Sequence, residues 1–173
     1  HHKIKIIPQG FRIEPIKGSD QPAVNSVPTF AYAGGFIPNI RDPRPFLDYL
    51  VKCGKEFKFV IFTNTEELVK PYKDILNSKL EVRGYLPRTN LLEYLVKMDF
   101  LVNFDNNTGV QLPSKLIDYA LVNRPILNVR SQPDEEIIDE FFEGNYGRSL
   151  QISNIEQYDI KNVSCQFTDI VKS

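Results

Sequence analysis

Apolar residues along this chain gather in short runs that alternate with amphipathic segments. The runs are rich in β-branched and aromatic residues, and they predict buried strands. The predicted strands span residues 29–34, 57–63, 80–84, 99–104 and 125–129. The segments between them place apolar residues at helical spacing and predict helices at residues 45–54, 65–76, 88–98 and, from Pro113 on, ahead of the fifth strand.

Strands that are apolar throughout, rather than at every second position, indicate a sheet that is covered by helices on both faces. Strict alternation of strands and helices is typical of parallel sheets. The predicted fold class is therefore α/β, with a Rossmann-like doubly wound parallel sheet. Pro71 lies inside the expected helix 65–76, and it should either kink that helix or start its second half.

The chain also has segments on either side of this pattern. Residues 3–28 hold a short strand and then a stretch rich in proline, glycine and serine, which we interpret as an interdomain crossing and linker. The histidines at residues 1–2 are interpreted as the remnant of a tag. The predicted Rossmann-like domain spans residues 29–152 and includes a further helix at 134–147, while residues 153–173 predict a last helix.

Composition and charge indicate a globular domain that does not bind a polyanion. With 173 residues, 42% of them hydrophobic, the chain is long enough for one well-filled core. Its 21 basic and 22 acidic residues are interspersed, so there is no basic surface to hold a nucleic acid or an anionic membrane. Cys53 and Cys165 match no metal-ligand or redox spacing and are expected to be reduced thiols of a cytoplasmic protein. No apolar run approaches the ~18 residues of a membrane span.

Ligands of open parallel sheets bind beyond the carboxyl ends of the strands, so the loops that follow the strands are the places to expect chemistry. After the first strand, Gly34 and Gly35 let the backbone approach a ligand closely, and Arg41 follows in the same loop. A plain tight turn is the alternative interpretation of the two glycines. After the second strand come Thr63 and Asn64, and Thr65 is expected to cap the next helix.

The third loop contains Tyr85, Leu86 and Pro87, which form either a wall for a planar group or a simple hydrophobic turn. The fourth loop leads into the helix after Pro113, where Ser114 and Lys115 would stand beside free backbone N–H groups. Such a site fits an anion, and a diphosphate in particular. Asp118 falls one turn further, where its carboxylate can accept hydrogen bonds from the hydroxyls of an attached ribose. The alternative is a solvated lysine and aspartate on the outer face of the helix.

Metal and nucleophilic chemistry find little support in the sequence. The segment 105–107 offers a single carboxylate, which makes a weak metal site, so neither a metal nor another cofactor is expected. The only histidines are His1 and His2, which we assign to the tag. Ser–His or Cys–His machinery therefore has no base in this chain, and no catalytic residue is assigned.

The segment "PSKLIDYALVNRPIL" at residues 113–127, taken with the order of the preceding strands and loops, resembles the C-terminal, nucleotide-sugar-binding half of GT-B fold glycosyltransferases of the group-one class. The resemblance covers roughly residues 5–130. It implies that Arg41, six positions after Gly35, contacts the donor diphosphate together with Gly34, Gly35, Ser114 and Lys115. It also implies that Asp118, in place of the commoner glutamate, binds the ribose.

Further assignments follow from the same resemblance. Tyr85, Leu86 and Pro87 are assigned to the nucleobase. Many relatives have a sugar-contacting glutamate where this chain has Val110, so the donor sugar is assigned instead to Asn106, Asn107 and Thr108.

The resemblance implies that this chain is the donor-binding half of a glycosyltransferase that moves a sugar from a nucleotide diphosphate sugar to an acceptor. An N-terminal domain with the acceptor site and often the catalytic base would precede residue 1, and the last helix would pack back towards it. The isolated chain is expected to be inactive. A nucleotide-sugar epimerase of GT-B architecture and a non-catalytic nucleotide-sugar-binding module are the alternatives, and Val110 favours the latter. The sequence specifies neither sugar, nucleobase, acceptor nor stereochemical outcome.

Overall fold

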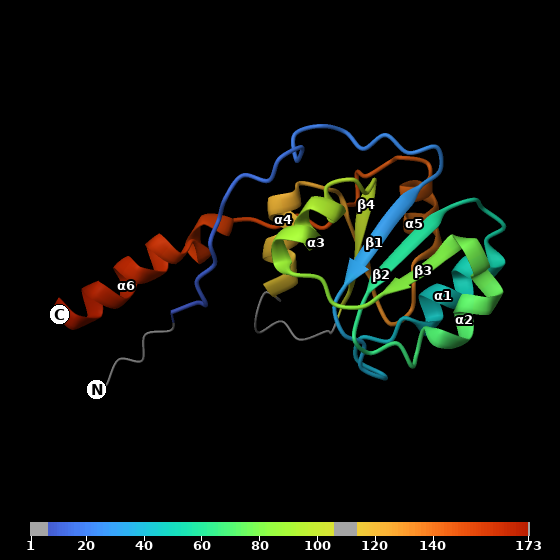
Figure 1. Ribbon diagram of the computed structural model, residues 1–173, viewed down its shortest axis with the longest axis horizontal. Coiled ribbons are helices and arrows are strands. Elements are labelled where there is room, and N and C mark those ends of the chain that lie inside the picture. Colours follow the sequence, from blue (N-terminus) through green and yellow to red (C-terminus); the bar gives the residue numbers. More distant parts are fainter. Residues whose placement is uncertain (1–6, 106–113, 173) are drawn as a thin grey trace. The chain divides into compact units, whose positions relative to one another are not determined.

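The computed structural model describes residues 7–105 and 114–172, with the side chains of 171 and 172 left out. The chain forms two compact units, one spanning Ile16–Gln151 and the other made of the described parts of His1–Pro15 and Ile152–Ser173. The larger unit is built around a five-stranded parallel sheet with the order β3-β2-β1-β4-β5 (Figure 1). This arrangement confirms the predicted Rossmann-like α/β fold.

The elements of the larger unit follow one another as predicted. The strands are β1 Thr29–Ala33, β2 Lys58–Phe62, β3 Leu80–Arg83, β4 Phe100–Phe104 and β5 Ile126–Val129. The helices are α1 Arg44–Lys52, α2 Lys70–Leu76, α3 Arg88–Leu95, α4 Ser114–Val122 and α5 Glu135–Phe142, and a short 3-10 helix spans Asn77–Lys79. Figure 1 shows α3 and α4 on one side of the sheet and α1 and α2 on the other.

Aromatic side chains fill the core on the side of α1 and α2. Phe30, in the central strand β1, stacks on Phe59 of β2 and on Phe100 of β4, with ring centroids 4.7 and 4.6 Å apart. Phe46 of α1 and Phe141 of α5 are buried in the same cluster. These strands bury side chains on both faces, which explains why they read as continuous apolar runs.

The strands β1 and β4 part towards their carboxyl ends. The pairing of β1 with β2 runs along all of β1, whereas the pairing with β4 covers only Phe30 and Ala31. Beyond that point the N–H of Ala33 donates instead to the buried hydroxyl of Tyr119, which reaches across from α4, at 2.8 Å. The strand order reverses between β1 and β4, and this is where open α/β sheets form their ligand crevice.

Several helix boundaries differ from the prediction, most clearly those of α2 and α5. The helix expected at 65–76 begins only at Lys70, with Pro71 in its first turn, so the proline starts a helix and does not kink one. Thr65 is not a cap, because its Oγ1 accepts a hydrogen bond from the distant N–H of Phe36 at 2.7 Å. The helix expected at 134–147 is capped by Asp134 as a good N-cap should be, but it ends at Phe142, ahead of Gly144 with its φ of +78°.

The smaller unit joins the two ends of the chain. Phe11 exchanges backbone hydrogen bonds with Tyr158 and Ile160, at 2.7 and 2.8 Å. A short 3-10 helix, Ile155–Tyr158, precedes the helix α6, Ile160–Lys172, so the helix expected at 153–173 starts later than predicted. None of the described helices is long and apolar enough to cross a bilayer.

Arg124 fastens the segment that leads into β1 onto the larger unit. Its guanidinium donates to the carbonyl oxygen of Val96 and to those of Gly18, Ser19 and Gln21. The carbonyl groups of a coil segment thereby find a charged donor, in a part of the chain that has no strand partner. Nothing in the local sequence around Arg124 indicates this contact, because the acceptors lie up to 106 residues away.

Replacing Arg124 with alanine should lower the free energy of unfolding by about 2–3 kcal/mol, since several charge-assisted hydrogen bonds are lost together. Urea unfolding followed by circular dichroism measures the change. Arg148→Ala is a suitable control, because Arg148 pairs with Glu140 at the surface and should matter little. An Arg124→Ala midpoint equal to that of Arg148→Ala would contradict the assignment.

Candidate functional site

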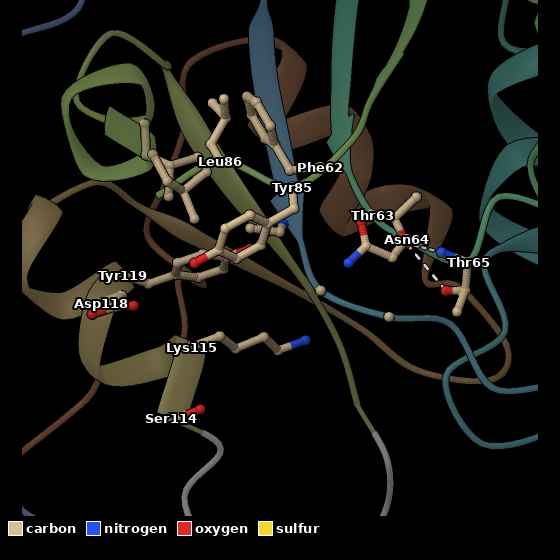
Figure 2. Close-up of a pocket in the computed structure, with 15 residues that line it drawn as sticks. Phe62, Thr63, Asn64, Thr65, Tyr85, Leu86, Ser114, Lys115, Asp118 and Tyr119 are labelled. Atoms are coloured by element: carbon tan, nitrogen blue, oxygen red, sulfur yellow. Dashed lines mark hydrogen bonds between the residues drawn. The ribbon is translucent and has the colours of Figure 1, made fainter. Parts of the chain in front are cut away.

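A cavity of about 370 Å³ opens at the carboxyl ends of β1 and β2 (Figure 2). Its apolar wall is formed by Phe62, Leu86, Leu91 and Leu95. Its polar lining comes from the loops after β1 and β2 and from α4, and includes Gly34, Gly35, Thr63, Asn64, Thr65, Ser114, Lys115 and Asp118. A mostly apolar pocket with a few convergent polar groups is typical of a small-molecule site.

The glycine loop lies on one side of this cavity. Gly34 has a φ of +149°, and a Cβ there would lie 2.9 Å from the hydroxyl oxygen of Tyr32. That hydroxyl donates to the carbonyl of Gly35 at 2.9 Å and so fixes the turn. A Cβ on Gly35 would meet Thr65 at an ordinary 3.6 Å. The geometry therefore requires a glycine at position 34 and leaves backbone open to the cavity.

Lys115 extends from the first turn of α4 towards the glycine loop (Figure 2). Its Nζ is buried, lies 4.6 Å from the centroid of the Tyr32 ring, and has no hydrogen-bond partner among the described residues. Burial, reinforced by the Arg41 guanidinium and opposed by the Asp105 carboxylate, lowers the pKa of Lys115 to about 7. A buried ammonium without partners is costly, and an anion in the cavity would remove that cost.

Arg41 does not line the cavity but lies close enough to act on Lys115. Backbone hydrogen bonds between Arg41 and Ile37, at 2.9 and 3.2 Å, fold the loop between them into a small closed turn. The Arg41 Nε is buried without a hydrogen-bond partner within the described part of the chain. Two cationic groups with unused donors thus lie near one another beside the glycine loop.

Asp118 lines the cavity one turn beyond Lys115, and it is not a solvated surface residue. Its Oδ1 accepts a hydrogen bond from Nε of Arg88 at 2.8 Å and forms an ion pair with Nη2 of the same residue at 2.7 Å. Arg88 is the first residue of α3. Sequence reasoning missed this ion pair, because the two residues are 30 positions apart and no local spacing links them.

Comparisons with known proteins find similar folds among solved structures only. No protein-family model matches the sequence, and a search of characterised proteins finds no match either. Among solved structures, the chain resembles the lipopolysaccharide outer core galactosyltransferase WaaB, with a TM-score of 0.65 and 12% identity over 96% of this chain and 55% of that one. A Rickettsia africae glycosyltransferase gives a TM-score of 0.66 and 10% identity over 98% and 57% of the two chains.

Anabaena HepE, solved in complex with UDP and glucose, gives a TM-score of 0.65 and 11% identity over 97% of this chain and 56% of that one. The chain has the fold of a GT-B glycosyltransferase domain. It spans about half the length of these matched structures. At this level of identity the likeness concerns the fold, and it confirms the predicted resemblance to one half of such enzymes.

The structure of this GT-B domain brings together most of the residues that the sequence indicated. The cavity is lined by Gly34, Gly35, Ser114, Lys115, Asp118, Tyr85 and Leu86, but not by Arg41. Pro87 does not line it and instead precedes α3. Tyr85 is 74% exposed, so the wall against a planar group comes mainly from Leu86 and from the buried Phe62. The roles assigned to these residues stay predictions.

The structure does not describe the residues assigned to the donor sugar, and the cavity includes residues that had not been assigned to a site. Asn106, Asn107 and Thr108, assigned to the donor sugar, and Val110 lie outside the described residues. Leu91 and Leu95 belong to the apolar residues of the helix expected at 88–98, and their helical spacing does not distinguish a core position from a cavity wall. Within the described ranges, no group of three or more histidines, cysteines or carboxylates is placed to hold a metal ion.

Proposed function

We propose that this chain is the donor-binding domain of a glycosyltransferase that transfers a sugar from a nucleoside diphosphate sugar. The observation that carries the proposal is the buried ammonium group of Lys115, which has no hydrogen-bond partner among the described residues and is directed into a cavity between a glycine loop and the start of α4. A site with a buried cation and open backbone is suited to an anion of the size of a diphosphate.

The diphosphate would be held from two sides. The start of α4 carries the positive end of the helix dipole, and Ser114 and Lys115 belong to that first turn. On the other side the backbone of Gly34 and Gly35 approaches the same space, and the Arg41 charge acts on Lys115. Fixed positive groups of this kind stabilise the charge that develops on a departing nucleoside diphosphate.

The nucleoside would occupy the remainder of the cavity. Asp118 supplies a carboxylate for ribose hydroxyls, and the apolar side chains of Phe62, Leu86 and Leu91 offer a surface for the flat face of a base. HepE has been solved with UDP and with UDP-glucose, which makes uridine nucleotides the first ligands to try. The donor sugar remains assigned, from the resemblance, to Asn106, Asn107 and Thr108, which lie outside the described residues.

Binding is expected to be weak in this chain, because it spans only about half the length of the matched enzymes and contacts from a second domain are missing. We expect calorimetry with UDP, GDP and ADP, in the presence of EDTA, to detect at least one nucleotide with a dissociation constant near the millimolar range. The matching nucleotide sugar should bind no more than about tenfold more tightly. No heat from any of them at millimolar concentration would count against the proposal.

We further propose that an N-terminal domain supplies the acceptor site and the catalytic base. The 173-residue chain alone should then transfer no sugar, even with donor and candidate acceptors present. Product analysis by mass spectrometry tests this, and transfer by the purified chain would contradict it. With the parent protein, a changed sugar in the absence of acceptor would indicate an epimerase, and binding without turnover would indicate a non-catalytic module.

A further inference from the structure

The Asp118 carboxylate is held from outside the cavity by Arg88. Both contacting nitrogens of Arg88 approach the same oxygen, Oδ1: Nε donates a hydrogen bond to it, and Nη2 forms an ion pair with it. The residues that the structure describes give no hydrogen bond to the other oxygen, Oδ2. The Asp118 side chain is 19% exposed and lines the cavity, whereas Arg88 does not.

The two oxygens of the Asp118 carboxylate therefore have different partners available to them. The planar guanidinium presents two donors in a rigid fork, so it fixes where Oδ1 lies and thereby how the carboxylate is turned. One oxygen is occupied by the protein, and the lone pairs of the second are left for another donor. The torsion that turns an aspartate carboxylate is broad, so without a partner the group would take many orientations, and the contact with Arg88 restricts them.

We propose that Arg88 is a positioning residue, which turns the Asp118 carboxylate so that Oδ2 accepts hydrogen bonds from the ribose hydroxyls of the bound nucleotide. This inference rests on the proposed nucleotide site. It implies that Arg88, without touching the ligand, makes the site prefer ribonucleotides to 2′-deoxyribonucleotides. The same residue follows Leu86 by two positions, so it also links the loop at the base end of the cavity to the helix that carries the ribose group.

A contribution to folding stability alone explains the Arg88–Asp118 ion pair less well than a role in the nucleotide site. The Arg88 side chain is 42% exposed, and ion pairs with such exposure contribute little to folding. Arg88→Ala is therefore expected to fold with a nearly unchanged melting temperature, and its binding can be measured. Arg148 provides a matched control, because its side chain is 39% exposed and it also pairs with a carboxylate, that of Glu140, outside the cavity.

The test is an NMR titration of amide resonances, which measures millimolar dissociation constants, with UDP, 2′-deoxy-UDP and pyrophosphate. The proteins are the parent chain, Arg88→Ala, Arg88→Lys, Asp118→Asn, the double variant Arg88→Ala/Asp118→Asn, and Arg148→Ala. We expect Arg88→Ala to weaken UDP binding by about threefold to tenfold, to lower the preference for UDP over 2′-deoxy-UDP, and to leave pyrophosphate unchanged. Arg88→Lys should restore part of the loss, and the double variant should bind UDP like Asp118→Asn alone.

The outcomes separate this inference from the function on which it rests. If Asp118→Asn weakens UDP binding while Arg88→Ala binds like Arg148→Ala, the role of Arg88 is wrong and the ribose assignment stands. If the losses of the two single variants add in the double variant, or if Arg88→Ala weakens pyrophosphate, Arg88 acts directly on the ligand and the inference is also wrong. If Asp118→Asn binds UDP like the parent, the placement of the nucleotide itself is wrong.

Discussion

Lys115→Met should weaken binding of a nucleoside diphosphate by about tenfold to a hundredfold and, in the same variant, make the ligand-free chain more stable. The affinity is lost because a charge-assisted hydrogen bond to phosphate contributes about 1.5–3 kcal/mol. The stability is gained because the Lys115 ammonium is buried and no described residue forms a hydrogen bond with it, whereas methionine fills the space without a charge. We expect a gain of about 1–3 kcal/mol in the free energy of unfolding.

Calorimetry with UDP and urea unfolding measure the two effects. The exposed Lys52, in the last turn of α1, gives a matched control, and Lys52→Met should change neither quantity appreciably. A Lys115→Met variant that is less stable than the parent would show that the ammonium serves the fold. Unchanged affinity would remove Lys115 from the diphosphate site.

Diphosphate affinity should fall as the pH rises above 7, by about tenfold per pH unit at most. Burial first, and then the Arg41 charge, lowers the pKa of Lys115 to about 7 in the free chain, so the side chain is largely neutral at pH 8 and above. A bound diphosphate favours the ammonium form, so its pKa rises in the complex and a proton is taken up on binding. Burial raises the pKa of Tyr32, which faces Lys115, to about 12, so the tyrosine does not titrate in this range.

UDP titrations between pH 6 and 9, in pairs of buffers with different heats of ionisation, measure both the slope and the proton uptake. Lys115→Met should abolish the slope above pH 7. The same linkage predicts that the contribution of Lys115 to the stability of the free chain rises with pH from about 7 towards 10.5, because the unfolded chain binds the extra proton there. Affinity that is constant from pH 7 to 9 would contradict this account.

The strands could be predicted from the sequence because burial on both faces of a sheet leaves a continuous apolar run. The first strand was expected at 29–34 and occupies Thr29–Ala33. The start of α2 could not be predicted as well. Thr65 and the acidic residues after it form a good local capping signal, but the Thr65 hydroxyl is used by Phe36, 29 residues away. A local pattern gives no information on such a competing partner.

In the cavity, too, local patterns predicted some residues, whereas contacts between distant residues could not be predicted. Gly34 and Lys115 were found because each follows directly from a local rule, a glycine after a strand and a cation in the first turn of a helix. The pairing of Arg88 with Asp118, and the Tyr119 hydroxyl that replaces a strand partner for Ala33, depend on how α3 and α4 pack. Contacts of this kind are specified only by the folded chain.

The most direct test of the central claim, that this cavity holds a nucleoside diphosphate, is an amide NMR map of the chain titrated with UDP in the presence of EDTA. The account predicts that the largest shifts fall on Gly34, Gly35 and the first turns of α4, with smaller shifts at Leu86. These shifts should be absent in Lys115→Met at the same ligand concentration. Shifts confined to α6 or to the region of Arg148, or no shifts at millimolar UDP, would contradict it.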